Sequence, residues 1–288
     1  MDPQLLTTFV TVARHGSFSA AATELGYTQS AISQQIAALE ADLGLALLSR
    51  RPVAPTPAGV RLLEHAEALL LRLRAARADV LRAAAPPRNR LRLAATPLAV
   101  NPVLAARLAR ARAREPRLEL TLSTCPAEQV LAEVAAGRAE LGLADGITAP
   151  SDPLRLPEAG LMTTTGVSQE DLVVVLPPDH PLAARTALRL GDLADARWLD
   201  TPLCPPSRLR DLVGDGFPAG LRYQGDDVHT LGTLVAAGHG LTLLPASATP
   251  RGVHGVALAE PRLAHRVELI HGTLPAGAAA DLASALAG

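Results

Sequence analysis

The sequence contains no lysine, because all 27 of its basic residues are arginine. They are balanced by 28 acidic residues, which leaves a formal net charge of -1 at pH 7. A chain without a large net charge is not drawn as a whole to nucleic acid or to a membrane surface. Any such partner must therefore be met by a local patch of the protein.

Cysteine is nearly absent, and long apolar runs are missing altogether. Cys125 and Cys204 are too few for a disulfide framework and fit a reducing compartment. No run reaches the roughly 18 uninterrupted apolar residues that a membrane-spanning helix needs. Asp2 stands where a secretory signal peptide would carry positive charge. We therefore expect a cytoplasmic protein with no membrane partner.

Apolar residues make up 48% of the 288-residue chain and charged residues 19%, proportions typical of folded proteins. Residues 1–82 read as helices, and the prolines of "AAAPPRNR" at 83–90 end that pattern. Beyond them, short strands alternate with helices, which favours α/β lobes with parallel strands. The predicted fold class is thus multidomain: a helical N-terminal domain with a long helix, then two α/β lobes.

The N-terminal residues fit a helix-turn-helix. Apolar spacing predicts a first helix at 5–14, and a second runs from 19 to Gly26 after Ser17, a plausible cap. Thr28 can cap the third helix. Ala22 is small where the second and third helices would cross, and Ile32 would fill the space beneath it. Two short helices joined by a three- or four-residue turn that contains glycine have the spacing of this motif.

The exposed side of the third helix carries short amides and hydroxyls. In a helix-turn-helix the first turns of the second helix enter the major groove, where Gln can pair with adenine and Ser can donate or accept. We therefore assign DNA contacts to Thr28, Gln29, Ser30, Ser33 and Gln34. A merely solvated polar helix is the alternative. The charge count supports that alternative, since residues 1–57 hold three arginines against four acids.

The segment "LALLSRRPVAPTPAG" at 45–59 predicts a wing. A strand at 45–49 and a return segment would enclose a tight turn, whose tip would hold Arg50 and Arg51 beside the third helix. Such arginines can contact phosphates or the minor groove. An ordinary solvated turn is the alternative.

Thr56 and Pro57 open a long helix that the pattern extends to about residue 84. Its apolar side chains recur at heptad spacing, which predicts pairing with a second copy of the helix. The resulting homodimer would present two DNA-binding heads to two half-sites. The side chains assigned to this dimer seam are Leu62, Ala66, Leu69, Leu73, Ala76 and Val80.

A family resemblance covers the whole chain and is strongest in residues 1–60. "LTTFVTVARHGSFSAAATELGYTQSAISQQIAALEADLGLALLSR…TPAG" resembles the N-terminal signature of the LysR-type transcriptional regulators of bacteria. The resemblance implies a winged helix-turn-helix at 1–57, a dimerising linker helix at 58–87, and at 88–288 a two-lobed effector-binding domain similar to periplasmic binding proteins. Thr28, Gln29, Ser30 and Ser33 match its recognition-helix positions, and Arg50 matches its wing arginine. It further implies a homotetramer, a dimer of dimers, that acts with RNA polymerase at promoter DNA.

The two lobes would comprise residues 88–165 with 265–288 and residues 166–264, with crossovers near 163–167 and 262–270. Ligands of α/β proteins bind at the C-terminal ends of parallel strands, where helices begin. A helix is expected to start directly after the strand at 91–95. Strand ends nominate six effector-binding residues: Thr96, Pro97, Ser123, Thr124, Thr201 and Val228.

The chemistry of the effector is left open by the sequence. The hydroxyls at helix starts would suit a carboxylate. In contrast, Asp145, Asp226 and Asp227, also at strand ends, would favour a cationic or hydroxyl-rich ligand. For each hydroxyl taken singly, a helix cap is the simpler interpretation.

No catalytic motif and no Cys/His cluster at metal-ligand spacing is found, so we expect neither enzymatic activity, nor a bound metal, nor a cofactor. The main hypothesis is a sequence-specific DNA-binding regulator modulated by a small-molecule effector bound between the lobes. One alternative is a small-molecule-binding receptor. Another is a thiol redox-sensing regulator that uses Cys125 and Cys204.

Overall fold

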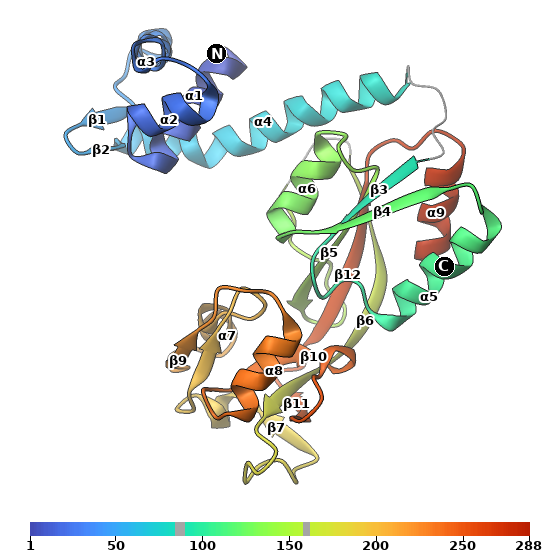
Figure 1. The fold of residues 1–288 in the computed structure, drawn as a ribbon. Coiled ribbons are helices and arrows are strands. Elements are labelled where there is room, and N and C mark those ends of the chain that lie inside the picture. The colour runs from blue at the N-terminus through green and yellow to red at the C-terminus, as the bar shows by residue number, and fades with distance from the viewer. Residues whose placement is uncertain (84–89, 158–161) are drawn as a thin grey trace. The chain divides into compact units, whose positions relative to one another are not determined.

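The computed structural model describes residues 1–83, 90–157 and 162–288 (Figure 1). The chain divides into two compact units, one formed mainly by residues 1–81 and the other by residues 82–156 and 162–288. The predicted boundary between residues 87 and 88, with its proline pair, lies outside the described residues. No helix in the described part of the chain is long and apolar enough to cross a membrane.

The N-terminal unit is a bundle of three helices followed by a two-stranded hairpin and a long helix. One core unites these elements, with Phe9, Ile32, Ile36 and Leu39 completely buried. Ala22 is buried in the same core, as its place at the helix crossing requires. The elements are α1 (Pro3–His15), α2 (Phe18–Leu25), α3 (Gln29–Leu43), β1 (Leu48–Arg50), β2 (Val53–Pro55) and α4 (Pro57–Ala83).

Local capping signals set the helix ends of this unit, as the sequence predicts. The Ser17 hydroxyl accepts from the Ala20 N–H, and the Thr28 hydroxyl accepts from the Ala31 N–H. Gly26 adopts a φ of 70°, the left-handed conformation that ends α2 at low cost. The wing forms, but its first strand is β1 at 48–50 and not 45–49.

Helix α4 begins at Pro57, and the Thr56 hydroxyl accepts from the Gly59 N–H at 3.1 Å. The predicted dimer seam divides along this helix. Ala66 is completely buried in the core of the N-terminal unit, and Leu62 packs against that core. Ala66 therefore belongs to the core of the DNA-binding head and is not free to meet a partner helix, whereas half-buried Leu62 is only partly covered by that core. The remaining seam residues are exposed on α4: Leu69, Leu73, Ala76 and Val80.

The second unit has two lobes built on one eight-stranded sheet. In lobe I, α5 and α9 share a core with the sheet, and α6 packs against β3, β5 and β12. The strands run in the order β4-β3-β5-β12-β6. Lobe I comprises β3 (Arg90–Ala95), α5 (Pro102–Arg114), β4 (Glu119–Thr124), α6 (Ala127–Ala135), β5 (Leu141–Thr148), β12 (Ala264–His271), α9 (Ala278–Ala287) and the first part of β6 (Thr163–Leu176).

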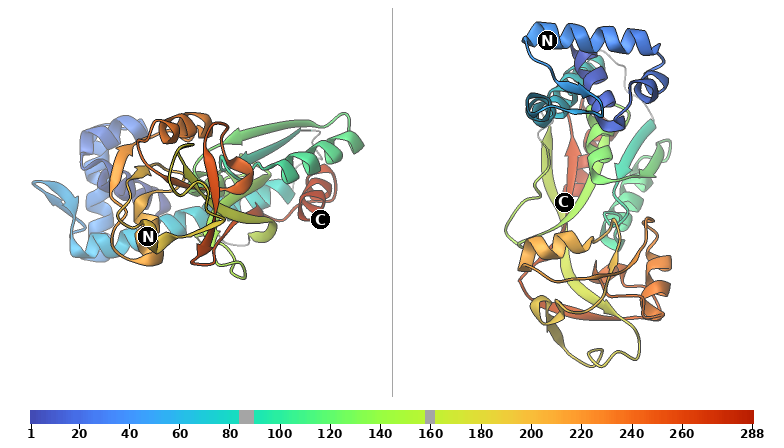
Figure 2. Two further views of the ribbon diagram at one scale, coloured as in Figure 1. Left: turned by 90° about the horizontal axis from the view of Figure 1, so that it is seen from below. Right: turned by 90° about the vertical axis from the view of Figure 1, so that its left-hand side faces the viewer.

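Strand β6 runs through both lobes (Figures 1 and 2). It pairs with β12 from Thr163 to Asp171 and with β10 and β11 from Leu172 to Leu176. The first lobe crossover therefore falls at 171–172, later than the 163–167 expected from the sequence. Because β12 is antiparallel to both β5 and β6, the sheet is mixed and not wholly parallel.

In lobe II, alternate residues of β6 face two separate cores. Val174 packs with Trp198 and Phe217, and Val175 packs with Leu199 and Leu231. Such alternation follows from the strand pleat. Lobe II further contains β7 (Ala187–Arg189), β8 (Trp198–Asp200), α7 (Pro206–Val213), β9 (Ala219–Arg222), α8 (Val228–Ala236), β10 (Thr242–Pro245) and β11 (His254–Glu260), with short 3-10 helices η1 (Leu190–Leu193) and η2 (Ala246–Ala248).

One predicted helix start is wrong. Helix α5 begins at Pro102, not at 96–97, and the Asn101 side chain caps it by accepting from the Leu104 N–H at 3.0 Å. Thr96 instead follows β3 directly, and its hydroxyl lies 3.4 Å from the Leu143 carbonyl. The signal was present in the sequence, because Asn followed by Pro is a common helix opening.

Candidate functional sites

The first candidate site is the N-terminal end of α3. Thr28, Gln29, Ser30 and Gln34 are exposed there, and Ser33 is half-buried. The side chains of Thr28 and Ser30 lie 3.0 Å apart, and the amide oxygen of Gln29 accepts from Ser19 on α2. This face is therefore a preorganised array of short donors and acceptors, the groups that base edges pair with.

The wing lies beside this array, and its two arginines differ in their contacts. Arg50 stacks over the Phe18 ring at 5.0 Å from its centroid and lies 3.6 Å from the Glu40 carboxylate. Glu40 also accepts the N–H groups of Leu47 and Leu48, so it ties the wing to α3. Arg50 is thus partly engaged in holding the wing, whereas Arg51 is exposed at the turn.

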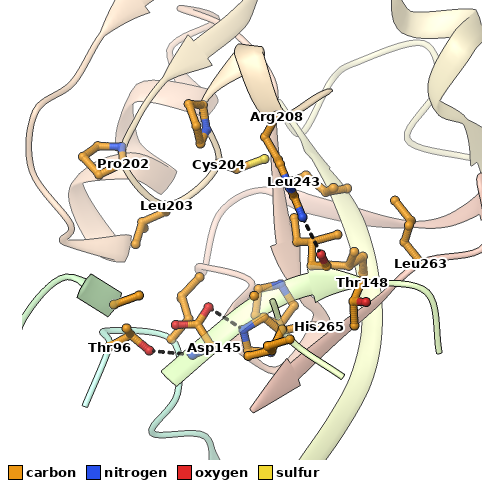
Figure 3. Close-up of a pocket in the computed structure, with 18 of the residues that line it drawn as sticks. Thr96, Asp145, Thr148, Pro202, Leu203, Cys204, Arg208, Leu243, Leu263 and His265 are labelled. Carbon is orange, nitrogen blue, oxygen red and sulfur yellow. Dashed lines mark hydrogen bonds and ion pairs between the residues drawn. The ribbon is translucent and has the colours of Figure 1, made fainter. Parts of the chain in front are cut away.

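The second candidate site is a pocket of about 940 Å³ in the unit formed by the two lobes. Its wall combines residues of β5 and the loop after it with the loop before α7 and the loop after β9. Figure 3 shows Thr96 and Asp145 from lobe I facing Leu203 and Cys204 from lobe II. A pocket of this size can enclose a small metabolite.

The structure separates the six nominated effector residues. Thr96 and Pro97 line the pocket, and the other four are not among the lining residues. The strand-end rule identified the right edge of the sheet but not which side chains face the cavity. The four that do not line it are Ser123, Thr124, Thr201 and Val228. The simpler interpretation, in which a strand-end hydroxyl caps the next helix, is also wrong for Ser123 and Thr124, because α6 has no side-chain cap.

Asp145 is fixed on the pocket wall by two neighbours, Thr96 and His265 (Figure 3). Its backbone N–H donates to the Thr96 hydroxyl at 3.0 Å, and its Oδ2 lies 2.8 Å from Nε2 of His265. The other imidazole nitrogen of His265 is buried without a hydrogen bond and lies 3.8 Å from Glu170. Glu170 in turn accepts from the backbone and hydroxyl of Ser247 in lobe II. The pocket wall is thereby linked to the β6 crossover.

Arg208 and Leu98 reach between the lobes, and the sequence gave no sign of either. Arg208, on the first turn of α7, donates to the Ile147 carbonyl of β5 at 2.9 Å (Figure 3). Leu98 of lobe I is buried in the lobe II core beside Leu199. Only the folded chain brings these residues together, since 61 positions separate the partners of the Arg208 bond.

The two thiols differ in their surroundings. Cys204 is buried at the pocket wall, and this burial raises the pKa of its thiol to about 12, against the opposing effects of a Leu243 backbone hydrogen bond and the Arg208 charge. Burial, with a smaller contribution from Glu133, also raises the pKa of Cys125. Both groups are therefore thiols and not reactive thiolates at neutral pH.

Two family models cover most of the sequence. That of the "Bacterial regulatory helix-turn-helix protein, lysR family" matches residues 3–60, and that of the "LysR substrate binding domain" matches residues 84–280. The chain belongs to the LysR family of bacterial transcriptional regulators. It accordingly combines a DNA-binding head with an effector-binding domain, as the resemblance of residues 1–60 implied.

Individual relatives agree with this assignment. A "Probable hydrogen peroxide-inducible genes activator" of Mycobacterium avium is 35% identical over 279 residues, which cover 92% of this chain and 86% of the relative. The solved C206 mutant of Corynebacterium glutamicum OxyR is 28% identical, with a TM-score of 0.53 over 99% of this chain and 90% of that one. The solved CbnR complexed with its target DNA, 22% identical with a TM-score of 0.53 over 99% and 98%, shares the fold.

Proposed function

We propose that this regulator binds its operator through the N-terminal face of α3, with Gln29, Ser30, Ser33 and Gln34 reading base edges. The exposed array of short amides and hydroxyls beside the wing is the observation that carries this proposal. Thr28 serves both as the cap of α3 and as a contact near the DNA backbone. Arg51 is the wing's phosphate ligand, and Arg50 both positions the wing and contributes positive charge.

The oligomer and the domain boundaries belong to the same proposal. We place the head at 1–57, the linker at 58–87, and the effector domain at 88–288, with the lobe boundaries moved from the expected 165/166 and 264/265 to the strand pairing, at 88–171 plus 264–288 and at 172–263. Leu62, Leu69, Leu73, Ala76 and Val80 form a homodimer seam, since apolar residues with exposed surface at heptad spacing favour helix pairing. Two dimers assemble into a homotetramer on the promoter.

In this proposal the pocket between the lobes binds a small molecule, and Thr96 and Pro97 belong to its wall. A ligand with higher affinity for one lobe arrangement shifts the population towards it. The shift changes the spacing of the heads and thereby the contact with RNA polymerase. The chain acts where the chromosome lies, in the cytoplasm, and it regulates without catalysing a reaction.

The decisive experiment is fluorescence anisotropy of the full chain against DNA from upstream of its own gene, with an unrelated duplex and a salt series alongside. We expect tight, salt-sensitive binding that prefers the upstream duplex. Gln29→Ala and Ser33→Ala should each lose about 1–3 kcal/mol of discrimination, and Arg51→Ala should weaken both duplexes alike. Gln129→Ala, far along the chain on α6, is the matched control. Unchanged discrimination in both α3 variants would refute the placement of α3.

A second candidate is a thiol redox-sensing regulator. The favouring observation is that the Mycobacterium avium relative is named for hydrogen peroxide-inducible genes. In this chain, Cys204 lines the pocket, and Cys125 is not among its lining residues. The test is peroxide treatment with thiol counting: oxidation of Cys204 that a Cys204→Ser variant abolishes together with the response would establish it. If both thiols were still titratable after the treatment, the redox-sensing function would be ruled out.

A further inference from the structure

Two of the charged side chains that line the pocket, Asp145 and Arg208, are held in place by hydrogen bonds that use only part of their capacity. Asp145 bonds His265 through Oδ2, and no described residue bonds its Oδ1. Arg208 donates one N–H to the Ile147 carbonyl, and no carboxylate in the described part of the chain forms an ion pair with Arg208. A guanidinium has five N–H donors in a planar fork, so Arg208 retains donors that match a ligand carboxylate.

Strand β5 provides the backbone positions at which these two groups are anchored. Asp145 and Ile147 are two residues apart on the strand, which corresponds to roughly 7 Å. Arg208 is held at the second position by its bond to the Ile147 carbonyl, and Figure 3 shows both side chains at the same cavity. A compact ligand with a donor cation at one end and a carboxylate at the other can meet both groups at once.

Ligands with charge of a single sign fit this wall less well. Of the strand-end hydroxyls that would suit a dicarboxylate, those of Ser123, Thr124 and Thr201 do not line the cavity. Thr96 does line it, but its hydroxyl is already bonded to the Asp145 N–H and the Leu143 carbonyl. The wall further carries the carboxylates of Asp152, Asp211 and Asp226 and the guanidinium of Arg155, an excess of negative charge that disfavours a second anionic group. A purely cationic ligand would instead leave the free edge of Arg208 facing another positive charge.

We propose that the effector is a compact zwitterion of the amino acid class, with its ammonium on Asp145 and its carboxylate on Arg208. This inference rests on the proposed function, since it names the ligand class of the pocket. Because Asp145 belongs to lobe I and Arg208 to lobe II, such a ligand bridges the lobes. It therefore binds the closed arrangement more tightly than an open one and shifts the population towards closure.

The test is binding of the free proteinogenic amino acids to the full chain, by thermal shift and then by calorimetry. For each amino acid that binds, the matching amine lacks the carboxylate and the matching 2-hydroxy acid lacks the ammonium. We expect each analogue to bind at least about tenfold more weakly, because a charge-assisted hydrogen bond is lost. A dicarboxylate or a polyamine that binds while no amino acid does, or no binding by any of these compounds, would overturn the proposal.

Variants assign the contacts. Asp145→Asn should weaken binding of the amino acid and leave the hydroxy acid unaffected, and Arg208→Gln should leave the amine unaffected. The controls are Asp195→Asn and Arg210→Gln, two residues that do not line the pocket. Equal amino acid affinity in the pocket variants and the controls would overturn the assignment.

Operator binding is measured on the same preparations. Since the heads lie in the other unit, every variant should retain it without ligand. Retained operator binding with no amino acid binding would refute the zwitterion alone. Loss of operator preference in the wild-type chain would refute the proposed function instead.

Discussion

Replacement of Gly59 by alanine should destabilise the DNA-binding head. Gly59 lies in the first turn of α4, where a Cβ would come within 2.1 Å of the Leu47 carbonyl oxygen. That carbonyl already accepts the Thr56 N–H at 2.9 Å, and the Leu47 N–H is held by Glu40 at 2.8 Å. The contact is with backbone on an anchored segment, so the strain cannot be relieved by turning a side chain.

The expected loss in the free energy of unfolding follows from two destabilising contributions and one stabilising contribution. Overpacking a fixed contact costs about 1–3 kcal/mol, and weakening the Thr56–Leu47 hydrogen bond costs about 1 kcal/mol. The higher helix propensity of alanine returns up to about 1 kcal/mol. The net loss is therefore about 2 kcal/mol, and it falls on the packing of α4 against the segment before the wing.

Hydrogen exchange of the full chain measures this loss locally. Amides of α1 near Phe9 and Val12, which are protected by the shared core, should exchange roughly thirtyfold faster if they open through the head's cooperative unfolding. Gly44→Ala is the control: its φ is 69° and no atom lies within 4 Å of the added Cβ, so only the backbone cost of about 1 kcal/mol applies. Exchange in Gly59→Ala at or below the wild-type rate would refute the reasoning.

Three further predictions concern other parts of the chain. Leu73→Asp should convert dimers to monomers in sedimentation, because Leu73 is half exposed on the seam and a buried carboxylate there would be unpaired. Iodoacetamide at neutral pH should label Cys204 far more slowly in the folded than in the denatured chain, since its thiol pKa is raised to about 12; equal rates would contradict its burial. Asp227 caps α8, and hydrogen bonds from the Thr230 side chain and N–H hold its pKa below the ordinary 3.8. Its contribution is thus present above pH 3.8 and lost as the pH falls through the lowered pKa, so Asp227→Asn should flatten the acid limb of thermal unfolding.

The head could be predicted in detail because its signals are local. Ser17 and Thr28 mark the starts of helices, Gly26 marks the end of one, and Ile32 marks the buried side of α3. Each of these features is decided within a few residues of the chain. The dimer seam stays a prediction, except that Ala66 is buried. Heptad spacing cannot show that Ala66 is buried in the core of its own unit.

The pocket could be predicted only as an edge of a sheet. Ser123 and Thr124 end a strand, as expected, yet they belong to β4, at the far edge of the sheet order from β6. Whether a strand-end hydroxyl faces the cavity depends on the order of the strands in the sheet and on the path of the loops. Neither can be predicted from the local sequence. Asn101–Pro102 was the one overlooked local signal, and it moves the start of α5 by several residues.

Contacts between the lobes explain why the functional residues of the pocket were the hardest to find. Leu98 leaves lobe I and fills a space in the lobe II core, so separating the lobes would expose its side chain to water at a cost of about 1.5–3 kcal/mol. The exposed Arg208–Ile147 bond adds less. Each of these contacts is worth at most a few kcal/mol, a range in which the differential affinity of a bridging ligand can shift the population of lobe arrangements.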